Sequence, residues 1–133
     1  MAGTIVADTI QDGAGNSTAM DNAIYGSAKA WVNFVGATAV KNASYNVSSV
    51  TRNAAGDYTV NFTNAFADAF YTTNVNGGAN TGGSWYGFCV PNAQAGSSYY
   101  QAPTTSSFRF ITSTTSTAGS NGDPLYVSVA CFR

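Results

Sequence analysis

The chain of 133 residues contains no histidine and no glutamate, and only 8% of its residues are charged. These two residue types supply most general acids and bases, and a serine or cysteine without an imidazole beside it is a weak nucleophile. Among the aspartates, Asp57 and Asp123 lie in predicted turns, and Asp8 and Asp12 lie near the N-terminus. Carboxylate catalysis needs two such groups facing each other across a cleft. We therefore expect a protein that is not an enzyme.

Basic residues are also few, and the five lysines and arginines are scattered along the chain. A nucleic-acid interface needs a contiguous positive patch, so we expect no nucleic-acid partner. The glycine-rich segment 76–84 is followed by neither a lysine nor a helical pattern, which excludes a phosphate-binding loop, and we expect no cofactor. No secretory signal and no stretch of about 18 apolar residues is present, so we expect synthesis in the cytoplasm and no membrane partner.

Cysteine occurs only twice, as Cys89 and Cys131, each inside an apolar run. Two interpretations stay open: two reduced, buried side chains, which cytoplasmic synthesis favours, or one disulfide. A metal site is not expected, because there is no histidine and the spacing of the two cysteines does not suit zinc.

What the chain has in quantity is hydrophobic and aromatic residues, with eight phenylalanines and eight tyrosines. In the stretch GDYTVNF, polar and apolar residues alternate, which is the period of a strand with one buried face. A second β-rich run covers 45–51, and the intervening RNAAGD contains the Asn, Gly and Asp typical of a hairpin loop. The sequence predicts a β-hairpin here.

Similar strand patterns recur along the chain, bounded by Gly, Asn, Pro or Ser. The predicted strands are 29–36, 45–51, 57–62, 70–75, 84–90, 107–113 and 125–132. They predict an all-β fold, an antiparallel β-sandwich or jelly-roll-like domain of about seven strands over residues 29–133. Residues 1–28 are smaller and more polar, and we interpret them as an N-terminal arm with at most one helical turn near 19–24.

The alternation also predicts which side chains meet between the sheets. The expected core is Val32, Phe34, Tyr45, Val47, Tyr58, Val60, Phe62, Phe70, Tyr86, Phe88, Val90, Phe108, Phe110, Val127, Val129 and Cys131. Four large residues, Trp31, Trp85, Tyr126 and Phe132, have the opposite parity. They are expected either beneath loops of the same chain or against another chain, and these alternatives stay open.

Three long loops, 76–84, 91–106 and 113–124, are rich in Gly, Ser, Thr and Asn, as binding tips or packing arms are. Within the second loop, Tyr99 and Tyr100 are flanked by small polar residues, a composition found in binding loops. The two tyrosines either contact a ligand or fasten the loop to the sheet.

The stretches AKAWVNF, SYNVSSVTRNAAGDYTVNFTNAFADAFY and the closing YVSVACFR resemble a β-rich domain of bacteriophage proteins. That domain ends many tail-fibre and other exterior virion proteins, especially in phages of marine and freshwater bacteria and cyanobacteria. The resemblance is close over residues 28–75 and loose over 108–133. It implies a homotrimeric virion structural protein on the particle exterior.

Two roles are compatible with this resemblance. In the first, the protein is a capsid decoration (cement) protein whose trimers bind the major capsid protein and stabilise the head. In the second, it is a tail-fibre or receptor-binding tip that contacts the host surface. The short arm favours the first role, because 28 residues are too few for a fibre shaft. The expected capsid or subunit contacts are Ile5, Val6, Ile10, Trp31, Tyr126 and Phe132. The expected receptor contacts are Trp85, Tyr99 and Tyr100.

Overall fold

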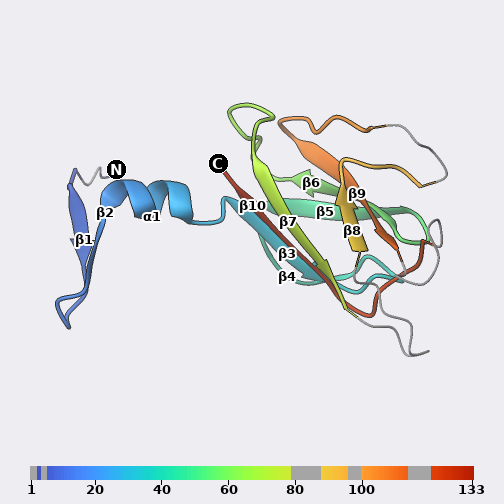
Figure 1. Cartoon of the computed structure of the whole chain (residues 1–133), viewed down its shortest axis with the longest axis horizontal. Helices are drawn as coiled ribbons and strands as arrows, with labels where there is room; N and C mark the ends of the chain where they lie inside the picture. Colours follow the sequence, from blue (N-terminus) through green and yellow to red (C-terminus); the bar gives the residue numbers. More distant parts are fainter. Residues whose placement is uncertain (1–2, 4–5, 79–87, 96–99, 114–120) are drawn as a thin grey trace.

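A computed structural model describes residues 3, 6–78, 88–95, 100–113 and 121–133. Eight strands form two four-stranded sheets that face each other (Figure 1). The first sheet has the order β4 (Lys41–Tyr45), β3 (Ala30–Phe34), β10 (Val127–Phe132), β7 (Thr72–Gly77). The second has the order β5 (Val47–Ala54), β6 (Asp57–Phe62), β9 (Ser107–Ser113), β8 (Phe88–Pro91). Every neighbouring pair is antiparallel, so the predicted all-β antiparallel sandwich is confirmed.

Three pairs of consecutive strands are neighbours in the same sheet: β3–β4, β5–β6 and β8–β9. The chain changes sheet after β4, β6, β7 and β9. The first strand of the sandwich, β3, pairs with the last, β10, and Trp31 lies opposite Ala130 in that pair. Residues at the start and end of the domain are therefore held together by a full ladder of backbone hydrogen bonds.

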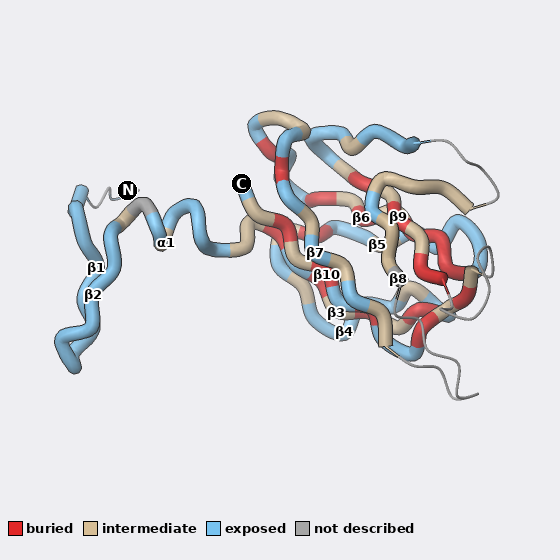
Figure 2. The backbone as a smooth tube through the Cα atoms, in the orientation of Figure 1, coloured by how far each residue is buried: buried red, intermediate tan, exposed pale blue. Residues whose placement is uncertain are grey.

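Alternating residues of both sheets fill the space between them (Figure 2). The buried apolar side chains are Ala30, Val32, Phe34, Val47, Tyr58, Val60, Phe62, Phe66, Tyr71, Phe108, Phe110, Val127, Val129 and Cys131. Phe34 of one sheet meets Tyr58 of the other edge to face, with ring centroids 5.2 Å apart. Each buried aromatic ring of this kind contributes roughly 1.5–3 kcal/mol through loss of water contact.

The core prediction is confirmed for most of its members, but it is wrong for two. Tyr45 is exposed at the end of β4, and Phe70 is 87% exposed. Val90 is half-buried, while Tyr86 and the side chain of Phe88 lie outside the described residues. The prediction also omitted Ala30, Phe66 and Tyr71, which are buried. Both cysteines are free: Cys131 is buried and Cys89 half-buried.

Tyr45 fails as a core residue because the predicted strand 45–51 is really two strands in different sheets. Asn46 separates β4 from β5 and has a left-handed backbone with φ 54°. Its side chain holds the bend, because Nδ2 donates to the Lys29 and Asn64 carbonyls and Oδ1 accepts from the Asn64 amide at 2.8 Å. Asparagine tolerates this conformation better than most residues. The chain thus turns outward at Tyr45 and inward at Val47.

The predicted hairpin over β5 and β6 is confirmed, with Arg52 opposite Tyr58 and Ala54 opposite Asp57. Its turn contains Gly56, which has φ 67°. A Cβ atom there would lie 2.5 Å from the Gly122 amide nitrogen and 2.6 Å from the Thr112 carbonyl oxygen. The turn therefore packs against another loop so closely that only glycine fits.

The N-terminal arm has its own small structure. It comprises β1 (Thr9–Gln11), β2 (Ser17–Ala19) and the helix α1 (Met20–Gly26), so the helix is longer than the single turn expected and the hairpin was not anticipated. Asp12 shapes the hairpin turn, because Oδ1 accepts hydrogen bonds from the amides of Ala14 and Asn16. Figure 1 shows the hairpin and the helix projecting away from the sandwich. The helix lies on the side of the C-terminus, and the hairpin lies farther out.

Candidate functional site

The arm presents apolar side chains to solvent. Every residue of β1 and β2 is exposed, as are Val6, Ile24 and Tyr25, and Val6 is 92% exposed. A two-stranded hairpin is marginal in water on its own, and so is a helix of seven residues. The N-cap residue of the helix, Ala19, also provides no side-chain hydrogen bond to its first turn. The arm therefore gains little stability from its own chain and is suited to pack on a different surface.

A second exposed surface is the outer face of the sheet β4-β3-β10-β7, which we call the open face. Tyr45, Trp31, Ala130 and Asn74 lie side by side across its four strands. Tyr45 is 59% and Trp31 40% exposed. Phe132 has the same parity as Ala130 on β10, so it belongs to this face and lies at the end next to the arm.

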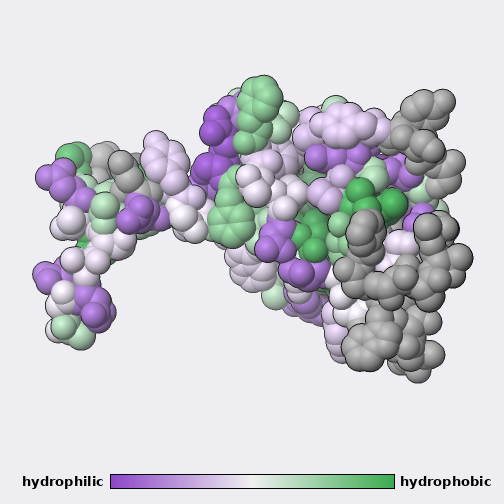
Figure 3. Space-filling view, viewed as in Figure 1, coloured by the Kyte–Doolittle hydropathy of each residue, from purple (hydrophilic) through white to green (hydrophobic). Residues whose placement is uncertain are grey.

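The rest of the open face is made of uncharged polar side chains that bond to each other. Asn33 donates to Ser128 at 2.9 Å, Asn42 donates to Asn33 at 2.8 Å, and Asn76 donates to Asn74 at 2.7 Å. Figure 3 shows apolar residues on the end of the sandwich near the arm, interrupted by hydrophilic ones. The face thus offers aromatic contact at one end and an ordered amide surface over the remainder.

The end of the sandwich beside the arm carries a further exposed ring, Phe70. Its amide donates to Asp68 Oδ1 at 2.9 Å, and Asp68 also forms an ion pair with the C-terminal Arg133. The hydrogen bond from Arg133 is the main cause that lowers the pKa of Asp68. The ion pair fastens the loop that bears Phe70 to the last residue of the chain.

The most buried charge in the described part of the chain belongs to Asp57. Arg109 binds it through Nε at 2.7 Å and Nη2 at 2.8 Å, and the Ala95 amide and Asn53 add two more hydrogen bonds. Burial alone would raise the pKa of Asp57, but these donors together outweigh it and hold the pKa below its usual value. The pair fixes the segment after β8 onto the sheet and explains Asp57 more fully than the predicted turn does.

Asp123 is engaged in the same way at the same end of β6, beside Gly56 and Tyr58. Its carboxylate accepts from Arg52, from the Gly56 amide at 2.9 Å and from the Tyr58 hydroxyl at 2.6 Å. Burial opposes ionisation, yet the hydrogen bonds lower the pKa of Asp123 overall. Burial and the neighbouring carboxylate raise the pKa of Tyr58 far above its normal value. These groups are locked into structural pairs.

Three of the aspartates are held in ion pairs. Asp57, Asp68 and Asp123 each face an arginine and not a second carboxylate. Within the described ranges no group of three or more His, Cys, Asp or Glu residues could hold a metal ion. Burial raises the pKa of the Cys131 thiol to about 12, which keeps it protonated and unreactive. Among the described helices, none is long and apolar enough to cross a membrane.

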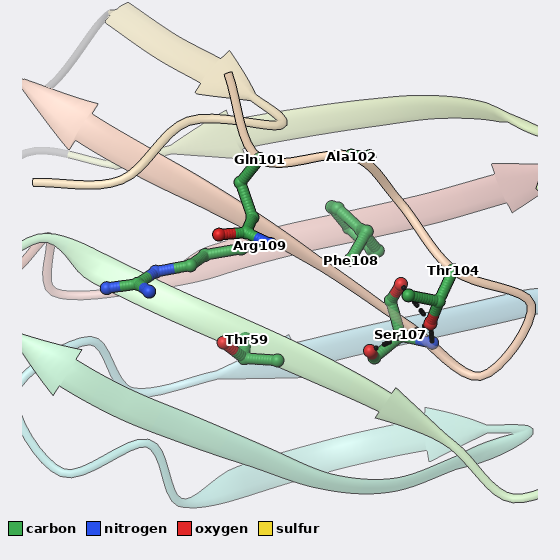
Figure 4. A pocket seen from close by; sticks show the side chains of 7 residues that line it. All are labelled: Thr59, Gln101, Ala102, Thr104, Ser107, Phe108 and Arg109. Carbon is green, nitrogen blue, oxygen red and sulfur yellow. Dashed lines mark hydrogen bonds between the residues drawn. The ribbon is translucent and has the colours of Figure 1, made fainter. Parts of the chain in front are cut away.

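One hollow is present on the outer face of the other sheet, where β6 and β9 meet the segment 101–104 (Figure 4). It has a volume of about 160 Å³ and opens to solvent. It is lined by Thr59, Gln101, Ala102, Thr104, Ser107, Phe108 and Arg109. Figure 4 shows the Gln101 side chain directed toward Arg109, with Thr59 below and Ser107 and Thr104 at the other end.

The expected site residues are only partly brought together. Trp31 and Phe132 share the open face, whereas Tyr126 precedes the opposite end of β10, about 20 Å away at the rise of a strand. Val6 and Ile10 are exposed on the arm. Ile5, Trp85 and Tyr99 lie outside the described residues.

The other expected receptor contact, Tyr100, is 72% exposed, and its backbone forms an isolated bridge with Ala93. Sequence reasoning missed Tyr45 and Phe70 as surface aromatics. It also missed the hollow at Gln101 and Thr59. Thr59 and Asn61 alternate with the apolar residues of β6, and this alternation could have predicted a polar outer face there.

No family model, no curated protein and no solved structure matches this chain. The features that bear on function are therefore the arm, the open face and the hollow. The resemblance to exterior phage proteins stays a prediction.

Proposed function

We propose that the chain is a non-enzymatic structural protein of a bacteriophage virion, a decoration protein that binds the outer capsid surface through its N-terminal arm. The observation that carries the proposal is the arm itself. It is folded, it exposes Val6, Ile10 and Ile24, and it projects away from the only hydrophobic core that the described part of the chain forms.

The energetics favour docking of the arm on a preformed surface. Burial of an exposed aliphatic side chain contributes roughly 1.5–3 kcal/mol, part of which offsets the ordering of the arm. One arm with a few such residues binds weakly. Several arms carried by one oligomer raise the effective concentration of each other, so their combined binding is much stronger. A lattice of identical capsid subunits offers the repeated sites that this requires.

The sandwich suits the second part of the role, which is to remain rigid outside the particle. Each of its three arginines is paired with an aspartate, and its core is continuous. We propose that the aromatic end of the open face, formed by Trp31, Tyr45 and Phe132, mediates the homotrimer that the sequence resemblance implies. Aromatic residues are enriched at the centres of such interfaces.

The decisive experiment removes residues 2–27 and measures binding to capsids that lack the protein. We expect the truncated chain to keep its β-sheet circular dichroism and to lose co-sedimentation with capsids. A finer pair of variants is Ile10→Ser and Thr18→Ser, which alter opposed positions of the arm hairpin. Only the first should weaken binding. Undiminished capsid binding by the truncated chain contradicts the proposal.

The alternative is a receptor-binding fibre tip, and the exposed Tyr100 favours it. Replacement of Tyr99 and Tyr100 by alanine would then reduce adsorption of phage to host cells and leave the melting temperature unchanged. The location of the protein separates the two roles directly, because immunogold labelling would mark the head in one case and the tail in the other.

A further inference from the structure

We propose that the hollow between β6, β9 and the segment 101–104 is a binding site for one ring of a neutral saccharide. This site uses residues distinct from the arm and the open face, so it goes beyond the proposed attachment role. Its volume of about 160 Å³ is well below the roughly 300–1,000 Å³ of pockets for drug-sized ligands. A single hexose ring is a ligand of suitable size.

The walls of the hollow are held in place independently of any ligand. The Asn92 amide donates to the Arg109 carbonyl at 2.7 Å, and the Gln101 amide donates to the Asn92 carbonyl at 2.8 Å. On the other side, the Tyr71 hydroxyl donates to the Thr104 carbonyl at 2.9 Å. The segment is therefore fastened to the sheet at both ends of the hollow, and a preformed site loses little entropy when it binds.

The chemistry of the lining indicates a neutral ligand rich in hydroxyl groups. Gln101 supplies an amide that can donate and accept, and the Thr59 hydroxyl accepts from Asn53 and has its own proton to donate, whereas the Thr104 and Ser107 hydroxyls bond to each other. Arg109 is the one charged side chain among the lining residues, and Asp57 already neutralises it. A phosphate or carboxylate would therefore meet no uncompensated positive charge.

Arg109 is nevertheless equipped to orient a ligand. Its hydrogen bonds to Asp57 use Nε and Nη2, the two nitrogens on one edge of the guanidinium. The Nη1 group on the opposite edge carries two further donors. A guanidinium held by a buried carboxylate is a fixed donor, and a sugar hydroxyl within its reach would be oriented without reorganisation of the side chain.

Tyr100 is an exposed aromatic residue adjacent in the chain to the lining segment, although it is not itself one of the lining residues. It immediately precedes Gln101, is 72% exposed, and is anchored through its backbone bridge to Ala93. Aromatic faces accept the C–H groups of sugar rings, and tyrosine adds a hydroxyl at low conformational cost. A fixed polar hollow with a neighbouring exposed tyrosine therefore combines both elements that a saccharide needs.

The test is a titration of the full-length ¹⁵N-labelled protein with glucose, galactose and mannose, each to about 100 mM, followed by two-dimensional NMR. At least one hexose should give saturable shifts that centre on the amides of Gln101, Ser107 and Arg109. A ligand of this size is expected to bind with a Kd on the order of 1–10 mM. Absence of saturable shifts with all three sugars, or shifts centred on another surface, would overturn the proposal.

Matched variants make the test specific. Gln101→Ala should weaken the binding about three- to tenfold, since it removes one hydrogen-bonding group from the lining. Thr51→Ala is the control, because Thr51 pairs with Thr59 on the neighbouring strand but does not line the hollow. Both variants should keep the wild-type melting temperature. Unchanged affinity in Gln101→Ala, or tighter binding of inorganic phosphate at the same residues, would also overturn the assignment. None of these outcomes depends on capsid binding.

Discussion

The arm and the sandwich of this chain differ in where they place their apolar residues. In the sandwich, apolar residues of two sheets bury each other and each buried charge is paired, as with Asp57 and Arg109. In the arm, Val6 and Ile10 face solvent, and the described hydrogen bonds are mostly those of one turn and one short helix. The sandwich buries its own apolar residues, whereas the arm leaves apolar residues exposed to solvent. The residues that stabilise the fold are therefore different from those that we propose attach it.

The two outer sheet faces differ in a related way. The described segments 92–95 and 100–104 lie over part of the sheet β5-β6-β9-β8: the Ala95 amide reaches Asp57 Oδ2 at 2.8 Å, and Gln101 and Thr104 line the hollow above Thr59. The open face of the other sheet exposes Trp31 and Tyr45. Among the described residues, one outer face thus carries a small hollow beneath the chain's own segment, and the other presents aromatic rings to solvent.

The largest expected effect comes from Asp57→Asn, which keeps the shape of the side chain and removes its charge. One of the two carboxylate oxygens would become an amide NH2 that cannot accept from Arg109 or the Ala95 amide, and Arg109 would lose its counter-charge, so we expect the free energy of unfolding to fall by about 2–4 kcal/mol. Urea denaturation measures it. The matched control is Asp12→Asn in the arm hairpin, which should leave the unfolding of the sandwich unchanged. Equal losses in both variants would show that arm and sandwich unfold as one unit.

A smaller effect is expected from pH. The folded-state pKa values of Asp57 and Asp123 lie below the ordinary value of 3.8. Each group therefore binds fewer protons in the folded state, and the stability that it contributes is present above about pH 4 and is lost as the pH falls through the lower folded value. The melting temperature should be flat between pH 7 and pH 5 and should decline below pH 4. Asp57→Asn should decline less steeply, and an identical slope would contradict this assignment.

Much of the sandwich was predictable because strand alternation is a local property. The predicted strands 57–62 and 107–113 agree with β6 and β9 at both ends, since Tyr58, Val60 and Phe110 define a buried face without ambiguity. On β3, the buried residues Val32 and Phe34 alternate with Trp31, so the outward parity of Trp31 was recognisable from the sequence.

The errors lie where local pattern gives no information. A continuous β-rich run conceals the left-handed Asn46, which moves the chain to the other sheet and turns Tyr45 outward. Phe70 belongs to a loop and not to a strand, so alternation does not apply to it. The pairing of Asp57 with Arg109 joins residues 52 positions apart, and the hollow beside Arg109 depends on that contact. Such partners are set by the arrangement of strands, which one sequence does not specify.

The smallest expected effect on folding is that of removing residues 2–27, and this makes it the sharpest test of the contrast between arm and sandwich. The sandwich begins with β3 at Ala30, and among the described residues its core contains none before Ala30. We therefore expect the truncated chain to unfold in urea within about 0.5 kcal/mol of the full chain and with nearly the same cooperativity. A loss several times larger would mean that the arm packs on a sandwich, its own or a neighbour's. Dilution distinguishes these cases, because only stabilisation by a neighbour depends on protein concentration.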